Sequence, residues 1–303
     1  MKRRGAVLLM TLLLIAIMSG GIALLLSQSD QLLRLSERSR IDAEISKISS
    51  DLKRLLPGML SKIGSAHDLE YAMILPLSSR STDGRFTLDA SLHSSLGRFN
   101  INKVCDASGK QIEPYSTLLS AIFTHYPIAA PDTFINILYD TIDTDLAERQ
   151  AGSEVAAVFS DFHNGSIENF AQFRQIIARY LALTKDRQIL AIPWERIIGF
   201  EGEKIDINYA SPELVALIVP EMDTETLHRI TDLRTVPFES KEQVVAAAAQ
   251  LSPVYDTWFM TYSAGNSYPL IGKVAMEMDG TRSEFEFHID TLNRMLNRLE
   301  IIQ

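Results

Sequence analysis

Acidic side chains are concentrated in one short segment in the middle of the chain. Five carboxylates fall within fifteen residues: Asp140, Asp143, Asp145, Glu148 and Glu154. Like charges repel one another at this density, and a Ca²⁺ ion with six to eight oxygen ligands commonly stabilises such a cluster. Gly152 lies within the segment and allows the chain to bend back. The segment is therefore a candidate calcium site, and a solvated helix end capped by Asp145 is the alternative.

Other residue types that carry chemistry are dispersed. The six histidines show no i, i+4 or His-Glu-x-x-His spacing, and the acidic segment lacks the spacing of an EF-hand. The single cysteine, Cys105, excludes an intrachain disulfide and a four-cysteine metal site. The chain has no nucleophile elbow, no Gly-x-Gly-x-x-Gly and no phosphate-binding loop. We therefore expect a binding protein and no enzyme, with a hydrolase built from dispersed residues as a further hypothesis.

The net charge argues against a nucleic-acid partner. The chain has 29 Lys and Arg against 38 Asp and Glu, which gives a formal charge of −9 over 303 residues. No basic cluster follows residue 5. An acidic protein without a local basic patch repels a phosphate backbone, so we expect no nucleic acid.

The first element that the sequence predicts is an apolar stretch near the N-terminus. Lys2, Arg3 and Arg4 precede residues 6–26, which carry no charge. A helix of this length spans about 32 Å and matches a hydrocarbon core of about 30 Å. Basic residues stay on the cytoplasmic side, so the rest of the chain is expected outside the cytoplasm.

An amphipathic helix is expected to continue from this apolar span. Its apolar stripe repeats at intervals of four and three residues and ends before Pro57, with members Ile41, Ile45, Ile48, Leu52 and Leu55. The sequence thus predicts one long helix over residues 6–56, of which 6–26 crosses the membrane.

The remainder of the chain reads as strands, then helices, then strands. Alternating apolar residues between Tyr71 and Leu92, around Asp83-Gly84, predict a hairpin. Helical periodicity runs from Ser116 to Leu251. Strands are expected again at 258–262, 271–278 and 285–289. The predicted fold is α+β: a pilin-like domain from residues 57–104 and 254–303, with an all-helical domain inserted at 105–253.

The N-terminus resembles the class III signal of type IV pilins and type II secretion pseudopilins, which is a basic head that ends in glycine before an apolar helix. The resemblance implies cleavage by a prepilin peptidase between Gly5 and Ala6, followed by methylation of the new N-terminus. Most pilins carry Glu at the fifth mature position, where this chain has Met10. Met10 cannot form the pair that such a carboxylate makes with a neighbouring amino terminus.

Further segments resemble the family of the minor pseudopilin K, which typically lacks that Glu and occupies the filament tip. They are Arg98-Phe99-Asn100-Ile101-Asn102, the acidic run from Asp140 to Glu154, and Ile205 to Pro212. The family carries calcium in its helical domain, which makes calcium the expected cofactor here. The departures are Tyr139 and Thr141 beside Asp140, and a longer stretch from Asn164 to Phe200.

Residues 205–234 also resemble half of a helix-hairpin-helix DNA-binding unit. The hairpin reads Val219-Pro220-Glu221-Met222-Asp223, with no glycine and two carboxylates, so it would repel a phosphate. We interpret it as a packing unit. A DNA-uptake component or minor pilin of a transformation or type IV pilus system is the alternative function.

The resemblance thus implies a minor pseudopilin that initiates or caps a pseudopilus and supports secretion across the outer membrane. It implies single-pass insertion in a bacterial inner membrane, with the N-terminus cytoplasmic and the C-terminal domain periplasmic. The expected partners are minor pseudopilins similar to I and J, which meet the helix stripe, together with the prepilin peptidase and the inner-membrane assembly platform.

Overall fold

The computed structural model describes residues 50, 54, 58, 60–74, 77–80, 86–231, 235–278, 281–292 and 296–302. The chain divides into two compact units, Met1–Gly58 and Met59–Gln303. The predicted leader, membrane span and helix stripe lie outside the described residues, and with them Gly5, Ala6, Met10, Ile41, Ile45, Ile48, Leu52 and Leu55. Within the described residues, no helix is long and apolar enough to cross a membrane.

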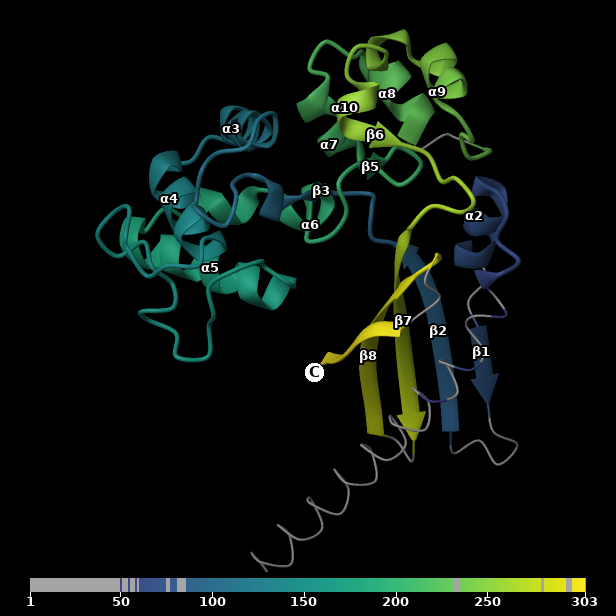
Figure 1. Cartoon of the computed structure of the whole chain (residues 1–303), viewed down its shortest axis with the longest axis horizontal. Helices are drawn as coiled ribbons and strands as arrows, with labels where there is room; N and C mark the ends of the chain where they lie inside the picture. Colours follow the sequence, from purple (N-terminus) through teal and green to yellow (C-terminus); the bar gives the residue numbers. More distant parts are fainter. Residues whose placement is uncertain are drawn as a thin grey trace, which may run out of the picture. The chain divides into compact units, whose positions relative to one another are not determined.

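An antiparallel sheet joins the two ends of the second unit. Among the described residues its strand order is β1-β2-β7-β8-β9. The strands are β1 (Leu77–Arg80), β2 (Phe86–Ser94), β7 (Pro269–Met278), β8 (Thr281–Asp290) and β9 (Leu296–Ile302). Because β2 pairs with β7, segments before and after the helical block form one sheet, as predicted (Figure 1).

The two faces of the sheet differ in polarity because side chains alternate along each strand. Leu92, Val274 and Phe287 are buried on one face, whereas Lys273 and Glu277 are exposed on the other. Phe287 lies directly opposite Gly272, and a Cβ atom at Gly272 would come within 2.0 Å of the phenylalanine ring. Gly272 therefore makes room for a large side chain from the neighbouring strand.

Helix α2 (Ala66–Ile74) occupies part of the segment where the sequence predicted the first strand. The backbone N–H of Asp68 donates to Ser65 Oγ at 3.1 Å, and Gly64 N–H donates to Asp68 Oδ2 at 3.1 Å. These bonds satisfy free N–H groups at the helix start. The prediction of a strand from Tyr71 was wrong, but the hairpin is confirmed because β1 pairs antiparallel with β2.

Two helical groups follow β2 (Figure 1). Their buried apolar residues belong to one core. The first contains β3 (Phe99–Asn100), η1 (Ile101–Lys103), α3 (Tyr115–His125), α4 (Pro131–Ile142), α5 (Phe170–Thr184), η2 (Arg187–Ala191), α6 (Trp194–Ile197) and β4 (Ile198–Gly199). The second contains β5 (Ile205–Asp206), α7 (Pro212–Ile218), α8 (Thr224–Thr231), α9 (Lys241–Ala247), η3 (Ala249–Leu251), α10 (Tyr255–Trp258) and β6 (Phe259–Met260). The expected strand at 258–262 is thus reduced to β6.

The two groups repeat the same framework. In each, the opening strand pairs in parallel with the closing strand, β3 with β4 and β5 with β6. An asparagine just after the opening strand forms two hydrogen bonds with the backbone of a residue that is distant in the sequence. We call this pair of bonds an asparagine clamp. Asn102 donates to Ile167 O at 2.9 Å and accepts from Ile167 N at 2.7 Å. Asn208 makes the same two bonds to Phe238, at 2.9 and 2.7 Å.

The clamped residue is followed in both groups by the same helix cap. Asn169 accepts from Gln172 N at 3.0 Å at the start of α5, and Ser240 accepts from Gln243 N at 3.4 Å at the start of α9. Each glutamine side chain in turn accepts from the backbone N–H of the residue before the cap. These reciprocal bonds resemble a capping box in which the glutamine bonds to the residue before the cap. The asparagine clamp and the helix start are thus adjacent parts of the same arrangement.

Buried polar contacts connect the sheet to the helical groups. Tyr268 Oη donates to Asp206 Oδ2 at 2.7 Å and lies 2.7 Å from Ser94 Oγ. On the polar face, His288 Nδ1 lies 2.9 Å from Glu201 Oε1, and Nε2 lies 3.3 Å from Glu286 Oε1. The two helical groups together are called the helical body, residues 96–267. The chain enters and leaves this body at one place beside the sheet, since Ser95 N donates to Pro269 O at 3.3 Å.

Candidate functional site

The acidic segment begins at the C-terminal end of α4. This helix starts with Pro131 in its first turn and ends where Asp143 adopts an extended backbone with ψ of 166°. Asp140 and Asp143 are thus one turn apart at a helix C-terminus, where the helix dipole disfavours negative charge. Two carboxylates at this position require compensating donors or cations.

Burial separates the five predicted ligands into two sets. Asp140, Asp143 and Glu154 have exposed fractions of 0%, 1% and 2%, whereas Asp145 and Glu148 are exposed. The exposed pair serves the loop backbone: Asp145 Oδ1 accepts from Ala147 N at 2.8 Å, and Glu148 Oε2 accepts from Gly152 N at 3.0 Å. The structure therefore brings three of the five carboxylates into the protein interior and leaves two at the surface.

Arg149 compensates part of the buried charge. Its Nε lies 3.0 Å from Asp140 Oδ1, and its Nη2 donates to Asp143 Oδ2 at 3.0 Å. Its backbone N–H also donates to Asp140 Oδ2 at 2.9 Å, and Ser153 Oγ donates to the same oxygen. Asp140 is accordingly held by a guanidinium group, a backbone amide and a hydroxyl group.

Arg149 has two further neighbours, although its side chain remains 34% exposed. Its guanidinium group lies 5.9 Å from the centre of the Tyr139 ring, which favours a cation. Gly109 has a φ of 69°, and a Cβ atom built on it would come within 1.7 Å of Arg149 Nη2. The loop at Gly109 can therefore approach the guanidinium group because it has no side chain there.

Besides Asp140 Oδ1, which lies 3.0 Å from Arg149 Nε but makes no hydrogen bond, three oxygen atoms of this segment remain without a partner within the described residues. They are buried and have no hydrogen-bond partner there: Asp143 Oδ1, Glu154 Oε2 and Asn164 Oδ1. Asn164 belongs to the same group because its Nδ2 donates to Glu154 Oε1 and to Asp145 O, both at 2.7 Å. Leaving such oxygens buried without a donor or cation costs about 1–3 kcal/mol each.

Burial also alters the titration of the carboxylates. Removal from water raises the pKa of Asp143, and the hydrogen bond from Arg149 opposes the rise. Removal from water likewise raises the pKa of Glu154, and the hydrogen bond from Asn164 opposes it. A second positive charge near these two groups would favour their ionised forms.

The side chains in this loop match a hard cation in chemistry but not in number. Carboxylate and amide oxygens are the ligands that Ca²⁺ takes, and Asp143, Glu154 and Asn164 each present one. Among the described residues, no group of three or more His, Cys, Asp or Glu side chains is arranged to hold a metal ion. Arg149, Ser153 and Asn164 were not predicted as site residues, although all three lie within or near the acidic run.

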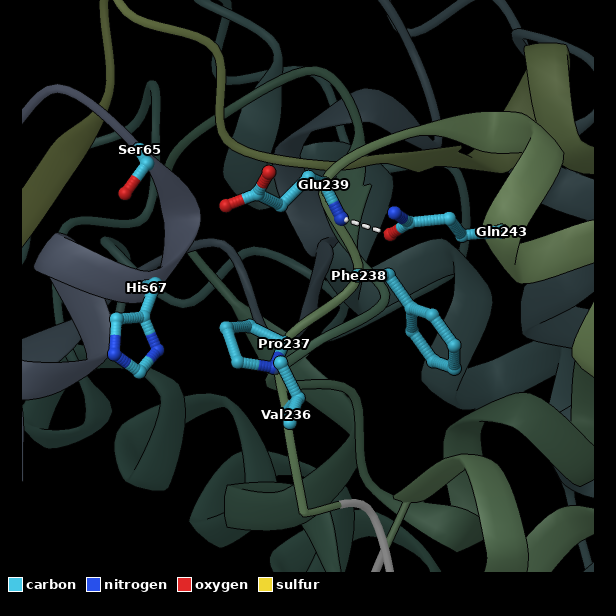
Figure 2. Close-up of a pocket in the computed structure, with 7 residues that line it drawn as sticks. All are labelled: Ser65, His67, Val236, Pro237, Phe238, Glu239 and Gln243. Atoms are coloured by element: carbon cyan, nitrogen blue, oxygen red, sulfur yellow. Dashed lines mark hydrogen bonds between the residues drawn. The ribbon is translucent and has the colours of Figure 1, made fainter.

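The described residues also form a surface pocket of about 680 Å³ between α2 and the loop that leads to α9. Its lining includes His67, Pro237 and Phe238 (Figure 2). Ser65 Oγ, also in the lining, donates to Asp68 Oδ2 at 3.0 Å, and Glu239 N–H donates to Gln243 Oε1 at 2.8 Å. Ser65 thus directs its hydroxyl group to a helix cap.

The hairpin with DNA-binding resemblance has its own cap. Between α7 and α8, Asp223 Oδ1 accepts from Thr226 N at 2.8 Å. A carboxylate therefore occupies the helix start that would face a phosphate in a DNA-binding unit.

Comparison with known proteins bears on the fold. No family model and no curated protein matches the chain. The chain is similar to one in the crystal structure of the GspK-GspI-GspJ complex from the type 2 secretion system of enterotoxigenic Escherichia coli. The TM-score is 0.60 with 12% identity, and the match covers 88% of this chain and 99% of that chain. This similarity supports a GspK-like arrangement of sheet and helical groups.

Proposed function

We propose that this chain is a minor pseudopilin of a type II secretion-like system, acting at the tip of a pseudopilus. The observation that carries the proposal is the structural match of 88% of this chain to 99% of one chain of the GspK-GspI-GspJ complex. The N-terminal signal adds independent support, because Lys-Arg-Arg-Gly directly precedes an apolar span. The work of this protein is binding and assembly, without catalysis.

The membrane part of the proposal rests on the sequence. A prepilin peptidase cleaves between Gly5 and Ala6, and the new N-terminus is methylated. The span at 6–26 holds the protein in the bacterial inner membrane, and the unit from Met59 to Gln303 lies in the periplasm. The stripe from Ile41 to Leu55 packs against helices of two smaller minor pseudopilins, and the assembly platform receives the complex.

The helical body gives the tip assignment a physical basis. It is inserted at one point of the sheet, between Ser95 and Pro269, so it adds bulk without interrupting a strand. A subunit that carries this body cannot be covered by a further pilin-like subunit. The protein therefore ends the filament and is present once per pseudopilus.

A deletion tests this role. Residues 96–267 are replaced by two glycines, which can join Ser95 to Tyr268 because the backbones of Ser95 and Pro269 are hydrogen-bonded. Full-length protein, when overproduced, is expected to shorten pseudopili, and the deleted variant is not. Electron microscopy measures filament length, and quantitative mass spectrometry measures copies per filament. Many copies of the full-length protein along the shaft would rule out the tip role.

We also propose that the acidic loop binds Ca²⁺ through Asp143, Glu154 and Asn164. Calcium is expected to raise the melting temperature, because it binds the folded state, and a chelator should reverse the rise. Asp143→Ala should abolish the response, whereas Asp145→Ala is the matched control, because its side chain is exposed and caps the loop. A melting temperature that changes neither in millimolar calcium nor in chelator would contradict this proposal.

A further inference from the structure

The helical body has an apolar core of its own. Among the described residues, the buried side chains that form this core run from Phe99 to Phe259, and no member comes from the five-stranded sheet. In the same part of the chain, no helix of the body packs extensively against a strand of that sheet. A domain that lacks a large apolar interface with its neighbour moves relative to it unless specific contacts hold it.

One buried polar contact lies where the body is attached. Tyr268, which directly precedes β7, donates from Oη to Asp206 Oδ2 at 2.7 Å, and both residues are buried. The same Oη lies 2.7 Å from Ser94 Oγ, and the next residue, Ser95, donates from its backbone N to Pro269 O. A contact placed at the entry and exit of the chain can act as a pivot, but it cannot by itself fix the angle of the body.

A second contact between body and sheet lies on the next strand, β8. His288 places Nδ1 2.9 Å from Glu201 Oε1, in the loop between β4 and β5, and Nε2 3.3 Å from Glu286 Oε1 on its own strand. An ionised carboxylate only accepts hydrogen bonds, and a neutral imidazole has a single N–H donor. Both contacts are therefore satisfied together only when His288 is protonated.

The other charged groups near His288 act on the sheet side of this contact. The hydrogen bond from His288 lowers the pKa of Glu286, and the charges of Lys273 and Arg98 add to this effect. Lys273 Nζ on β7 lies 3.8 Å from Glu286 Oε2. The link from His288 across to the body runs through Glu201, so it depends on the proton of the imidazole and the charge of that carboxylate.

The side of the body away from β8 has space for movement. In the strand order β1-β2-β7-β8-β9 the body is attached at β2 and β7, and α2 packs against β2 on the side opposite to β8. Between α2 and the loop that leads to α9 lies the open pocket of about 680 Å³ described above, with His67 and Pro237 in its lining (Figure 2). The body can therefore tilt toward α2 without separating a packed apolar interface.

We propose that Glu201, His288 and Glu286 form an ionic latch that fixes the angle of the helical body on the sheet, and that opening the latch lets the body tilt about the contact between Tyr268 and Asp206. The latch is closed at neutral pH. Loss of the proton from His288, or of the charge from Glu201, opens it. The inference does not depend on the proposed place of this chain in a pseudopilus.

The test measures the distance between a spin label on the body and one on the sheet, in full-length protein purified in detergent. The labels are attached to Ala178→Cys on α5 and Glu277→Cys on β7, because both positions are exposed. The native cysteine, Cys105, is buried and is not labelled. Pulsed electron paramagnetic resonance gives the distribution of distances.

The latch is removed by Glu201→Gln, which keeps the size of the side chain and deletes its charge. Glu203→Gln is the matched control, because Glu203 lies in the same loop and pairs at 3.3 Å with Lys103 inside the body. Near-ultraviolet circular dichroism checks that each variant keeps its tertiary structure. At about pH 7, Glu201→Gln should broaden the distribution and add distances that the wild type lacks, whereas Glu203→Gln should keep the narrow distribution.

A change of pH tests the histidine in the unmodified latch. Hydrogen bonds with Glu201 and then with Glu286 raise the pKa of His288 to about 9. The wild-type distribution should therefore broaden between about pH 7 and about pH 10, and Glu201→Gln should show no further change. His93, on the same face of the sheet, has its pKa lowered by burial, so it is neutral across this range.

Three results would overturn the latch. The first is a distribution in Glu201→Gln that is as narrow as in the wild type at about pH 7. The second is equal broadening in Glu203→Gln, because the effect would then belong to any charge in the loop. The third is a wild-type distribution that is already broad at neutral pH, because the contact would then not hold the body.

Discussion

At the scale of single residues, His288 is a titratable group with two carboxylate partners in a largely buried position. Hydrogen bonds with Glu201 and Glu286 raise its pKa from 6.5 to about 9, against the opposing effect of burial. The bond to His288 correspondingly lowers the pKa of Glu286. The folded state thus holds the proton of His288 more tightly than the unfolded chain does.

This shift gives the stability of the protein a defined pH dependence. Because the folded pKa lies above the unfolded value, the contribution is fully present below about pH 6.5 and is lost as the pH rises through about 9. It amounts to at most about 3 kcal/mol. His288→Gln should flatten the fall in the free energy of unfolding across this window, as measured by urea titration at a series of pH values.

His93→Gln is the control for this prediction. His93 lies on the same polar face, opposite Ile271, which in turn lies opposite His288. Burial lowers its pKa, so it titrates below the window. A pH slope that is the same in the wild type and His288→Gln would contradict the role assigned to His288.

The acidic loop shows which residue-scale features can be predicted from sequence. The density of Asp and Glu indicates that some of them need a cation, and the structure buries Asp140, Asp143 and Glu154. The sequence cannot show that a neighbouring side chain supplies one positive charge itself. That outcome depends on the turn after α4, which directs Arg149 back toward Asp140.

At the scale of elements, an asparagine clamp is among the features that recur in both helical groups. Asn208 is buried and both donates to and accepts from the backbone of Phe238. Asn208→Ala leaves that N–H and C=O without their partner, at a cost of about 2–4 kcal/mol. Asn102→Ala should cost at least as much, because Asn102 makes the equivalent two bonds to Ile167 and also donates to Phe200 O at 3.2 Å.

Substitutions at the helix cap provide the control for the clamps. Asn169→Ser places in the first group the residue type that Ser240 supplies in the second, so the free energy of unfolding should change by less than about 0.5 kcal/mol. Asn208→Asp should be nearly as destabilising as Asn208→Ala, because a carboxylate cannot donate a hydrogen bond to Phe238 O. Chemical denaturation measures each value, and a clamp substitution as mild as the cap substitution would contradict the assigned role.

The order of strands and helices was largely predictable because apolar periodicity reports burial. The errors have local causes. The apolar alternation that includes Met73 predicted a strand. Instead, the reciprocal bonds of Ser65 and Asp68 cap the start of helix α2, which includes Met73. Strand β9 was not predicted, since its sequence from Leu296 to Ile302 does not alternate, and it forms by pairing with β8. The parallel pairing of β5 with β6 joins residues too far apart for a local pattern to reveal.

At the scale of the whole molecule, a substitution at Met10 separates two explanations of the proposed tip role. Met10→Glu supplies the carboxylate that pilins offer to a neighbouring amino terminus. If the helical body ends the filament by its bulk, this variant should still shorten filaments when overproduced, as electron microscopy would show. Incorporation of the variant along the shaft would instead attribute termination to the missing carboxylate.

The repeated framework also explains where this architecture can vary. In the second group, few residues connect α8 to the clamped Phe238, whereas in the first the whole acidic loop lies between α4 and the clamped Ile167. Both ends of this connection are fixed, one by a helix end and the other by an asparagine. Each doubling of its length adds only about 0.6 kcal/mol to the entropic cost of closing the loop. The framework can therefore stay the same in both groups while the connection in one of them becomes longer. Related chains should differ most in length between α4 and the clamp, and least in the asparagines that bound it.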